Sequence, residues 1–395
     1  MLSAQKLKEK ILKDRYNSII FKKSRVRGVY LVGGYIRDIL RSKISKDRDF
    51  IVADDIRSFV NEVRKFIGGT LVEFKNAEMI RLVLKDGVTL DFSRPMGTLE
   101  EDLSKRDFTI NAIAWSPDSG IIDPYKGIED IKRRRISALS EKNFKADPLR
   151  MLRAYRFAAE LNGSIEDKTR RSIKTLYNKI KKVSPERITF ELFNLLNSEN
   201  PARYLNMALN DSLLRYILSI NKRTLEHNIK AIYRFKRQLN EHTKEVKVLL
   251  EEIFSQNITY KGLLLLELLL RRNGLFEPDR IPLIRISRNI AKRIMLTHKG
   301  LKEFKGGKLF DFFMKSKGAA MDIIILKDRM DLIKEYIRFK NIWKNGMISS
   351  LEVARIGKIK AGPRLGKVIA ELKKAEFERE IKSKEEAIRL ICYLT

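Results

Sequence analysis

The chain of 395 residues has very little of several residue types and patterns. Cysteine occurs once, at Cys392, which excludes an intrachain disulfide and a cluster of thiolate metal ligands. Long apolar runs are missing as well, because the longest, Leu263 to Leu270, is interrupted by Glu267 and is too short to cross a bilayer. The first residues, MLSAQKLKEKILKDRY, are charged and contain no apolar core of signal-peptide length. We therefore expect a soluble, cytoplasmic protein with no membrane-embedded part.

Acidic residues are scarce relative to basic ones. The 82 lysines and arginines exceed the 50 aspartates and glutamates, so the formal net charge is +32. Such an imbalance destabilises a compact chain by self-repulsion, and a polyanionic partner is the simplest reason for it. A lysine-rich surface of the thermophile type is the alternative, but that composition adds glutamate alongside lysine. Nucleic acid is therefore the expected partner.

Strand signals are confined to residues 26 to 125, where apolar runs alternate with turns such as Asp86-Gly87, a hairpin signal. The expected strands are Val29 to Val32, Phe50 to Val52, Thr70 to Phe74, Ile80 to Leu84, Val88 to Phe92 and Ile110 to Trp115. Helical periodicity dominates the rest of the chain. We expect an α+β protein: an N-terminal helix (1–25), a mixed-sheet head (26–140), and a helical neck (141–200), body (201–300) and tail (301–395).

The stretch Val29 to Ala53, VYLVGGYIRDILRSKISKDRDFIVA, carries the clearest functional signal. A strand that feeds through glycines, here Gly33-Gly34, into a helix start forms a physical anion site. Asp47 and Asp49 open the next strand, and residues two apart on a strand face the same side. Two carboxylates beside such a turn suit a pair of Mg²⁺ ions with a nucleoside triphosphate. Singly, a Gly-Gly pair is more often a plain turn and an Asp-x-Asp pair a solvated loop, so the hypothesis depends on their order and spacing.

This combination, GG-x-x-RD followed by D-x-D, resembles the nucleotidyltransferase motif of the DNA polymerase beta superfamily. In detail it is similar to the bacterial branch of tRNA nucleotidyltransferases and poly(A) polymerases, called class II. The resemblance implies that Asp47 and Asp49 hold Mg²⁺ and that Asp91, on the strand Val88 to Phe92, is a third metal-binding carboxylate. By its position alone, Asp91 is an ordinary strand-end residue. The resemblance also implies a set of residues that hold the triphosphate: Gly33, Gly34 and Arg37.

A longer signature follows at Glu100 to Ala112, EEDLSKRDFTINA. By residue type it is a charged helix cap that continues into a strand. It matches the family pattern EED-x-x-(K/R)RDFT-x-NA, and the resemblance assigns Arg106 to phosphate and Asp107 with Asn111 to the ribose hydroxyls, which would select ribonucleotides. Lys105 stands where the family usually has an arginine, a change that keeps the charge and loses the bidentate geometry.

The segment Asp147 to Ala158, DPLRMLRAYRFA, begins a helix with Asp147 at the N-cap and Pro148 at the first position. Three arginines share one face of it: Arg150, Arg153 and Arg156. A solvated face is one reading of this pattern. The resemblance instead makes the helix an amino-acid template, in which Asp147 and Arg150 hydrogen-bond the edge of the incoming base and the other arginines face the triphosphate. Ala146 replaces the usual glutamate, so base selectivity is altered or supported from elsewhere.

Two later segments are interpreted through the same resemblance. Ser184 to Leu192 is similar to a neck motif that holds the template helix. Leu351 to Leu372, LEVARIGKIKAGPRLGKVIAEL, is by pattern an ordinary helix–turn–helix and by resemblance a segment that grips the acceptor and T arms of tRNA. Its expected RNA contacts are Lys358, Lys360, Arg364 and Lys367. His227, His242 and His298 are isolated, without a His-Asp dipeptide, so we expect no metal phosphohydrolase domain of the kind some relatives append.

The resemblance implies an enzyme that extends the 3′ end of tRNA with CTP or ATP and uses Mg²⁺ as its cofactor. Only Phe92 to Leu99 separates Asp91 from the Glu100 motif. Family members that finish CCA with adenosine usually carry a longer flexible loop here, so CC addition is the expected subtype and CCA addition is the alternative within the same enzyme class. A poly(A) polymerase is one alternative. A basic RNA-binding protein without catalysis is another, and the three intact aspartates argue against it. The sequence indicates no oligomeric state.

Overall fold

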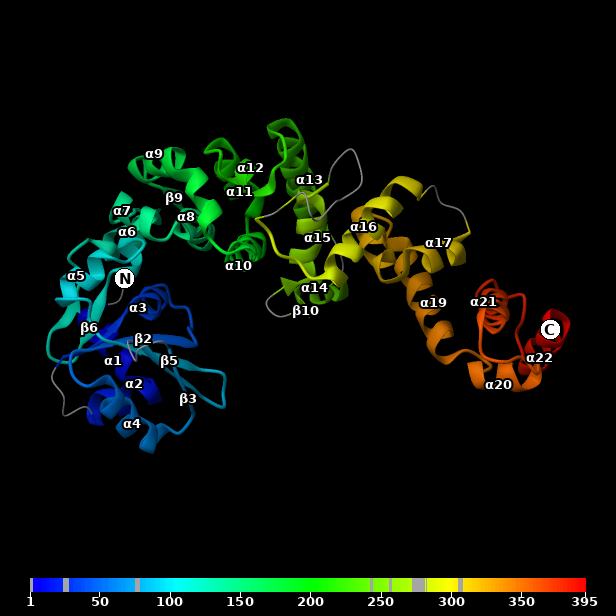
Figure 1. Ribbon diagram of the computed structural model, residues 1–395, viewed down its shortest axis with the longest axis horizontal. Helices are drawn as coiled ribbons and strands as arrows, with labels where there is room; N and C mark the ends of the chain where they lie inside the picture. Colours follow the sequence, from blue (N-terminus) through cyan, green and yellow to red (C-terminus); the bar gives the residue numbers. More distant parts are fainter. Residues whose placement is uncertain are drawn as a thin grey trace. The chain divides into compact units, whose positions relative to one another are not determined.

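The computed structural model describes residues 3–23, 28–74, 79–241, 244–255, 258–271, 281, 283–304 and 308–395 (Figure 1). His242 lies outside these residues. Contacts between residues divide the chain into two compact units, Met1–Leu225 and Glu226–Thr395. This division falls inside the region expected to be the helical body, and the finer domain boundaries stay predictions.

A seven-stranded mixed sheet is the centre of the first unit. All neighbouring strands are antiparallel except β2 and β5, which are parallel. The expected α+β head is therefore confirmed. In spatial order the strands are β3 (Thr70–Glu73), β4 (Met79–Val83), β5 (Thr89–Ser93), β2 (Asp47–Val52), β1 (Val29–Val32), β6 (Ala114–Ser116) and β7 (Gly120–Ile122).

One face of this sheet is packed with aromatic rings beneath helices α2 (Arg15–Lys23) and α4 (Ile56–Ile67). Phe50 of β2 stacks on Phe92 of β5, with ring centroids 5.2 Å apart, and Phe21 of α2 packs against Phe50. Side chains alternate along a strand, so the residues that precede Phe50 and Phe92 face the other side of the sheet. Those residues are Asp49 and Asp91. The aromatic core therefore fixes the direction in which both aspartates point.

Two sequence expectations for the first unit are wrong. The N-terminal segment forms α1 (Ala4–Lys13) and α2 instead of one helix, because Asp14 is extended and its carboxylate caps α2 through the amides of Tyr16 and Asn17. The expected strand Ile110 to Trp115 is a 3₁₀ turn, Thr109–Asn111, followed by the short β6. The buried side chain of Asn111 is hydrogen-bonded at this turn, and such bonds compete with a strand ladder.

The remaining elements of the first unit are mostly helices, which include the neck. Beside the sheet lie α3 (Gly34–Leu40), α5 (Leu99–Ser104) and α6 (Gly127–Arg133). Residues 135–218 form α7 (Glu141–Ala146), α8 (Leu149–Leu161), α9 (Asp167–Leu176), α10 (Pro185–Leu196), α11 (Pro201–Asn210) and α12 (Leu213–Leu218), with the short strand pair β8 (Arg135–Ile136) and β9 (Ser164–Ile165). The arginine-bearing helix α8 starts one residue later than expected, but the Asp147 carboxylate does cap it by accepting the Leu149 amide at 3.2 Å.

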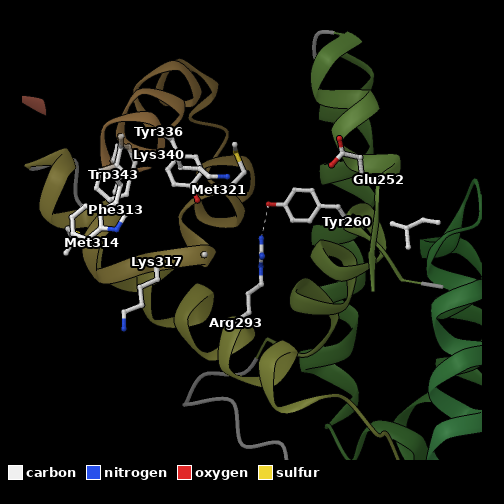
Figure 2. A pocket seen from close by; sticks show the side chains of 13 residues that line it. Glu252, Tyr260, Arg293, Phe313, Met314, Lys317, Met321, Tyr336, Lys340 and Trp343 are labelled. Atoms are coloured by element: carbon white, nitrogen blue, oxygen red, sulfur yellow. Dashed lines mark hydrogen bonds between the residues drawn. The ribbon is translucent and has the colours of Figure 1, made fainter. Parts of the chain in front are cut away.

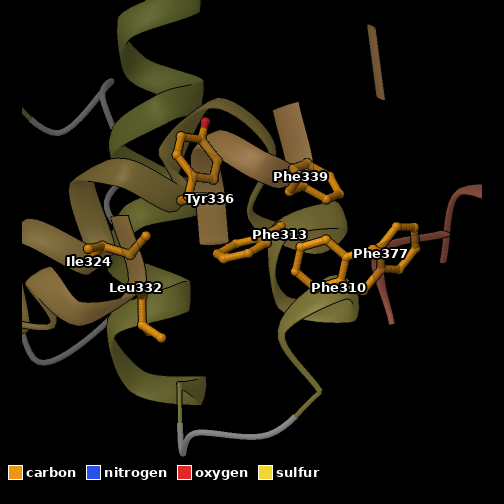
Figure 3. Close-up of a cluster of buried hydrophobic side chains, with 8 residues drawn as sticks. Phe310, Phe313, Ile324, Leu332, Tyr336, Phe339 and Phe377 are labelled. Atoms are coloured by element: carbon orange, nitrogen blue, oxygen red, sulfur yellow. The ribbon is translucent and has the colours of Figure 1, made fainter. Parts of the chain in front are cut away.

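The second unit is built mainly from helices around two apolar clusters. Figure 3 shows the first cluster, where the rings of Phe310, Phe313, Tyr336, Phe339 and Phe377 converge. The second joins the last three helices through Val353, Leu372 and Ile391. The unit contains most of α13 (Lys222–Glu241) and then α14 (Lys244–Glu251), β10 (Ile253–Ser255), β11 (Ile258–Thr259), α15 (Tyr260–Leu269), α16 (Arg288–Glu303), α17 (Leu309–Ser316), α18 (Ala320–Leu326), α19 (Ile333–Asn345), α20 (Ser350–Ile356), α21 (Pro363–Phe377) and α22 (Lys384–Leu394). No described helix has both the length and the apolar character that crossing a bilayer requires.

Candidate active site

The turn between β1 and α3 depends on a glycine at position 33. Gly33 has a φ of +75°, and a Cβ atom there would lie 2.8 Å from the Arg106 guanidinium and 3.3 Å from the Asp49 carboxylate. A side chain at this position would therefore be strained by the positive φ, and it would displace the Arg106 guanidinium and crowd the Asp49 carboxylate. The turn thus brings its own backbone close to the Arg106 guanidinium and the Asp49 carboxylate.

The three expected carboxylates lie on neighbouring strands. The parallel pairing of β2 with β5 places Asp49 directly opposite Asp91, and Asp47 lies two residues before Asp49 on the same face. The antiparallel pairing of β1 with β2 sets Asp49 opposite Val32, the residue before Gly33. Side chains with this register share one face of the sheet. Asp47, Asp49 and Asp91 therefore face the same side as the glycine turn.

The environment of Asp49 is unfavourable for a negative charge. Burial raises the pKa of its carboxyl group to about 6; the Arg106 guanidinium opposes this shift, and the charges of Asp91 and Asp47 add to it. A carboxylate in this position gains free energy when a cation lies next to it. The electrostatics of the site thus favour a bound cation beside Asp49.

Arg81 is a site residue that our sequence analysis did not identify. It lies on β4 opposite Asp91 and donates two hydrogen bonds to it, both of 2.7 Å, from Nε and Nη2. The pairing follows from the hairpin at Asp86-Gly87, where the Leu84 amide bonds the Val88 carbonyl. Counting outward from that bond pairs residue 81 with residue 91, so the hairpin register is the signal that would have revealed it.

The oxygen donors of this site suit Mg²⁺, which prefers carboxylates. As the chain stands, however, no group of three or more acidic, histidine or cysteine side chains among the described residues is close enough together to hold a metal ion. Asp91 is engaged by Arg81, and Asp47 accepts a hydrogen bond of 2.5 Å from the Thr89 hydroxyl. Asp49 and Asp47 are therefore the donors that fit a cation most directly, and Asp91 can join them once Arg81 releases it.

Basic side chains form the other wall of the site. The Nε atom of Arg106 is buried and has no hydrogen-bond partner among the described residues, so it is a donor available to an anion. Arg37 donates to the Asn111 amide oxygen at 2.6 Å, Asn111 donates to Asp107 at 2.8 Å, and Arg153 of α8 donates to Asp107 at 2.9 Å. These hydrogen bonds connect the head to the neck and fix Asp107 and Asn111 of the Glu100–Ala112 signature.

Asp107 is ionised within this network. Burial would raise the pKa of its carboxyl group, but the Arg153 guanidinium and the hydrogen bond from Asn111 outweigh burial and hold the pKa below its ordinary value. A charged acceptor with fixed partners keeps one orientation. Asp107 is therefore a preorganised, negatively charged side chain at the junction of head and neck.

Phe157 gathers three arginines of the site around one aromatic ring. The guanidinium carbons of Arg37, Arg153 and Arg156 lie 4.9, 5.1 and 3.8 Å from the ring centroid. Cations are attracted to the face of an aromatic ring. Below them, the buried carboxylate of Glu191 on α10 accepts a hydrogen bond from Arg156 at 2.6 Å and one from Arg153 at 3.3 Å. The segment interpreted as a neck motif therefore holds the arginine face of α8.

The expected base-recognition pair is supported by neighbours other than a glutamate at position 146. Arg187 of α10 donates to the Asp147 carboxylate at 2.8 Å. Arg150 donates to the backbone carbonyl of Lys105 at 2.7 Å. The Lys105 ammonium group itself bonds the Met96 carbonyl at 2.8 Å. Ala146 is exposed at the end of α7, so support for Asp147 and Arg150 comes from these contacts.

These side chains line one cleft of about 630 Å³ in the first unit. All thirteen head and neck residues predicted from the sequence are among its lining residues. The six that sequence reasoning missed are Tyr35, Asp38, Ser45, Arg81, Thr89 and Phe157. Six arginines and six aspartates line the cleft, so a triphosphate and cations can both find partners there. The predicted RNA contacts are elsewhere, exposed around the turn between α20 and α21: Lys358, Lys360, Arg364 and Lys367.

Comparison with known families agrees with this geometry. The family model described as "Poly A polymerase head domain" matches residues 29–137, which contain the sheet and its aspartates. A second model, "Probable RNA and SrmB- binding site of polymerase A", matches residues 164–222. The two matches cover the head and much of the neck.

The names of individual relatives carry three specificities: CC-adding, CCA-adding and A-adding. The CC-adding tRNA nucleotidyltransferase of Synechocystis is 36% identical over 194 residues, which are 48% of this chain and 46% of that protein. The CCA-adding enzyme of Leuconostoc mesenteroides is 32% identical over 206 residues, or 48% of this chain and 50% of that protein. The chain therefore spans about half the length of the curated relatives it matches.

The fold resembles a solved structure beyond the half of the chain that matches these relatives. The structure of the Thermotoga maritima CCA-adding enzyme complexed with tRNA aligns with a TM-score of 0.76 at 21% identity, covering 99% of this chain and 98% of that one. At this identity the likeness shows the fold alone. Over its head and neck, the chain is therefore similar to the class II tRNA nucleotidyltransferases and poly(A) polymerases.

Proposed function

We propose that this protein is a tRNA nucleotidyltransferase that adds nucleotides to the 3′ end of tRNA without a template. The observation that carries the proposal is the cleft in which three aspartates on adjacent strands face an arginine-lined wall from the neck. In the reaction, the 3′-hydroxyl of the RNA attacks the α-phosphorus of a nucleoside triphosphate. A new phosphodiester bond forms, and pyrophosphate leaves.

The protein side chains divide this work between the two walls of the cleft. Asp47 and Asp49 would hold Mg²⁺, with Asp91 as the third donor, in a family that typically uses divalent metal ions. Bound Mg²⁺ would lower the pKa of the attacking hydroxyl group and offset the charge of the triphosphate.

The second wall binds and orients the nucleotide. Arg106, whose Nε lacks a partner among the described residues, takes a phosphate oxygen beside Gly33 and Gly34. Arg37, Arg153 and Arg156 are held in place around Phe157, so their side chains lose little further freedom when the triphosphate binds.

Selection of the nucleotide involves two parts of the cleft. Asp107 and Asn111, fixed by their mutual hydrogen bond, face the ribose hydroxyls. Asp147 and Arg150 read the edge of the base, with Arg187 and the Lys105 carbonyl as their supports. Hydrogen-bonding groups that are already oriented discriminate against a wrong partner by leaving buried polar groups unpaired.

The tRNA would also be held by the second unit. The turn between α20 and α21 exposes four basic side chains, and added Cβ atoms at Gly362 and Gly366 would meet no neighbour, so the backbone there is open to a phosphate chain. Lysine, arginine and exposed backbone amides are the usual partners of nucleic-acid phosphates. These contacts suit the acceptor and T arms of the tRNA.

The subtype we propose is CC addition. The connection between β5 and α5 is short, Arg94 to Thr98. It is tied to α5 by the bond from Lys105 to the Met96 carbonyl and by the capping box between Thr98 and Glu101. A change from C to A specificity requires the base-reading pair to reorient, and a short, tied loop has little freedom to act as the lever for that change.

The subtype has a direct test. We expect tRNA that lacks its 3′ end to gain two C residues with CTP alone, and to gain no terminal A when ATP is added. The products of reactions with each labelled nucleotide, separately and together, are separated at single-nucleotide resolution. A product that ends in CCA with this enzyme alone would contradict CC addition, and long A tails on assorted RNAs with ATP alone would favour a poly(A) polymerase. No transfer with any nucleotide and Mg²⁺ would favour a non-catalytic RNA-binding protein.

Arg81 provides a second test, directed at the metal site. Because its guanidinium occupies Asp91, we expect Arg81→Met to lower the Mg²⁺ concentration at half-maximal transfer several-fold. The measurement is a Mg²⁺ titration of transfer at saturating CTP and RNA. Arg57→Met is the matched control, since Arg57 forms an exposed ion pair with Glu73 outside the cleft. A higher Mg²⁺ requirement for Arg81→Met would contradict competition between Arg81 and Mg²⁺ for Asp91. It would indicate instead that the arginine orients Asp91 for the metal.

A further inference from the structure

A second cavity, of about 730 Å³, lies within the helical unit, and the proposed reaction does not use it. This volume falls in the range of about 300–1,000 Å³ that is common for small-molecule sites. Side chains from α15, α16, α17 and α19 line it (Figure 2). Its composition is uneven, since one side is aromatic and the outer edge carries lysines.

The aromatic side is a ladder of rings along α19. Tyr336 and Phe339 are nearly parallel, with centroids 6.4 Å apart and an interplanar angle of 17°. Phe339 and Trp343 continue the ladder at 6.0 Å and 25°. The first two rings are buried in the core, whereas Trp343 is 44% exposed. The ladder therefore ends in an indole ring on which another flat ring can stack.

The inner end of the cavity is polar but electrically neutral. Arg293 donates two hydrogen bonds of 2.6 Å to Asp322, whose side chain is fully buried. It also donates one of 3.3 Å to the Tyr260 hydroxyl (Figure 2). Asp322 thus offsets the arginine charge, so the interior suits an uncharged, hydrogen-bonding ring better than a phosphate.

The charge lies at the outer edge. Lys317 and Lys340 line the cavity, are exposed, and form no ion pair with any described residue. Lys317 precedes Gly318, which lines the cavity as well. The single acidic residue of the lining, Glu252, is exposed and can accept a hydrogen bond from an exocyclic amino group. An indole ring on which a flat ring can stack, with lysines in the same lining that can take an anion, matches the two halves of a nucleotide.

We propose that this cavity binds a nucleobase stacked on Trp343, with the adjacent phosphate on Lys317 and Lys340. The base comes either from a free nucleotide or from an unpaired position of a bound RNA strand, because both present the same ring and phosphate. Stacking of a base on an aromatic side chain is sequence-tolerant, since every base has a π face.

The fluorescence of Trp343 can report the binding of a free nucleotide. The chain has two tryptophans, and the other, Trp115, is buried in the head. With full-length protein in EDTA, CMP and AMP are expected to quench tryptophan emission saturably, whereas ribose 5-phosphate is not. By equilibrium dialysis, Trp343→Ala should weaken CMP and AMP binding about tenfold, as expected for the loss of one stacked base. Trp343→Phe should lose the quenching signal and keep most of the binding.

The RNA arm uses filter binding, so it does not depend on catalysis. Trp343→Ala is expected to raise the Kd for tRNA about tenfold, and the control Ile337→Ala, an exposed residue on the same helix outside the cavity, is expected to leave it unchanged. A loss of mononucleotide binding would identify free nucleotide as the occupant, and a loss of RNA affinity alone would identify an unpaired base. If Trp343→Ala behaves like Ile337→Ala in both arms, the proposal is overturned and the cavity is left to a protein partner.

Discussion

Replacing Asp49 by asparagine is expected to lower nucleotidyl transfer by about 10³-fold or more, because a carboxylate that binds Mg²⁺ contributes several kcal/mol to transition-state stabilisation. Asparagine keeps the size of the side chain and removes the charge that makes this position fit a cation. RNA binding, measured by filter binding, should change little, because the predicted RNA contacts lie around the turn between α20 and α21. The measurement is the single-turnover rate with CTP and Mg²⁺.

The same substitution is expected to stabilise the protein at neutral pH. In the folded protein the pKa of Asp49 is about 6, above the ordinary value of 3.8, so the folded state binds this proton more tightly than the unfolded state. The stability gained from this bound proton is fully present below about pH 4 and is lost as the pH rises through 6. Because the side chain is only half-buried in the cleft, we expect Asp49→Asn to gain about 1–2 kcal/mol at pH 7.5 in EDTA and nothing at pH 4.

Two results would contradict this account of Asp49. The exposed Asp118, in the turn between β6 and β7, supplies the control Asp118→Asn, which should change neither activity nor stability. If Asp49→Asn transfers nucleotides at a rate near that of the original protein, the carboxylate is not a metal donor. If it instead loses activity, RNA affinity and stability together, the defect is a general loss of the fold.

The aspartates were predictable because their positions depend on short-range rules. Alternation along β2 places Asp47 and Asp49 on one face whatever the rest of the chain does. The glycine turn needs only the adjacent strand and helix. The position of Asp91 could not be predicted from local rules, because its strand pairs with β2 in parallel across an intervening helix and hairpin. The family resemblance supplied this assignment.

The residues that sequence reasoning missed depend on long-range packing. Arg81 enters the cleft through hairpin register, and Phe157 resembles any apolar residue of an amphipathic helix until the arginines close around it. Glu191 follows Arg153 by 38 positions, so no local pattern connects them. The expected strand at Ile110 fails for a similar reason, because buried side-chain bonds to Asn111 from other elements outweigh its apolar pattern.

Removing the carboxylate of Glu191 is expected to lower the free energy of unfolding by about 3–5 kcal/mol, the usual cost of breaking a buried ion pair from one side. Its two oxygens accept from Arg153 and Arg156, and the side chain is 4% exposed. Glu191→Ala leaves two guanidinium groups close together without this acceptor. The Tm measured by calorimetry should fall by roughly 10 °C. Under the proposed function, the KM for CTP should rise as well, because both arginines would lose the residue that positions them toward the triphosphate.

A matched pair of variants separates this effect from a general loss of charge. Glu141 pairs with Lys145 on α7, and both side chains are more than 40% exposed, so Glu141→Ala should cost no more than about 0.5 kcal/mol. Glu191→Gln keeps the shape and one acceptor oxygen, and should fall between Glu191→Ala and the original protein in both Tm and KM. Equal effects at positions 141 and 191 would show that α10 does not hold the arginine face of α8. A fall in Tm without a change in KM would leave Glu191 as a structural residue and would remove Arg153 and Arg156 from the triphosphate site.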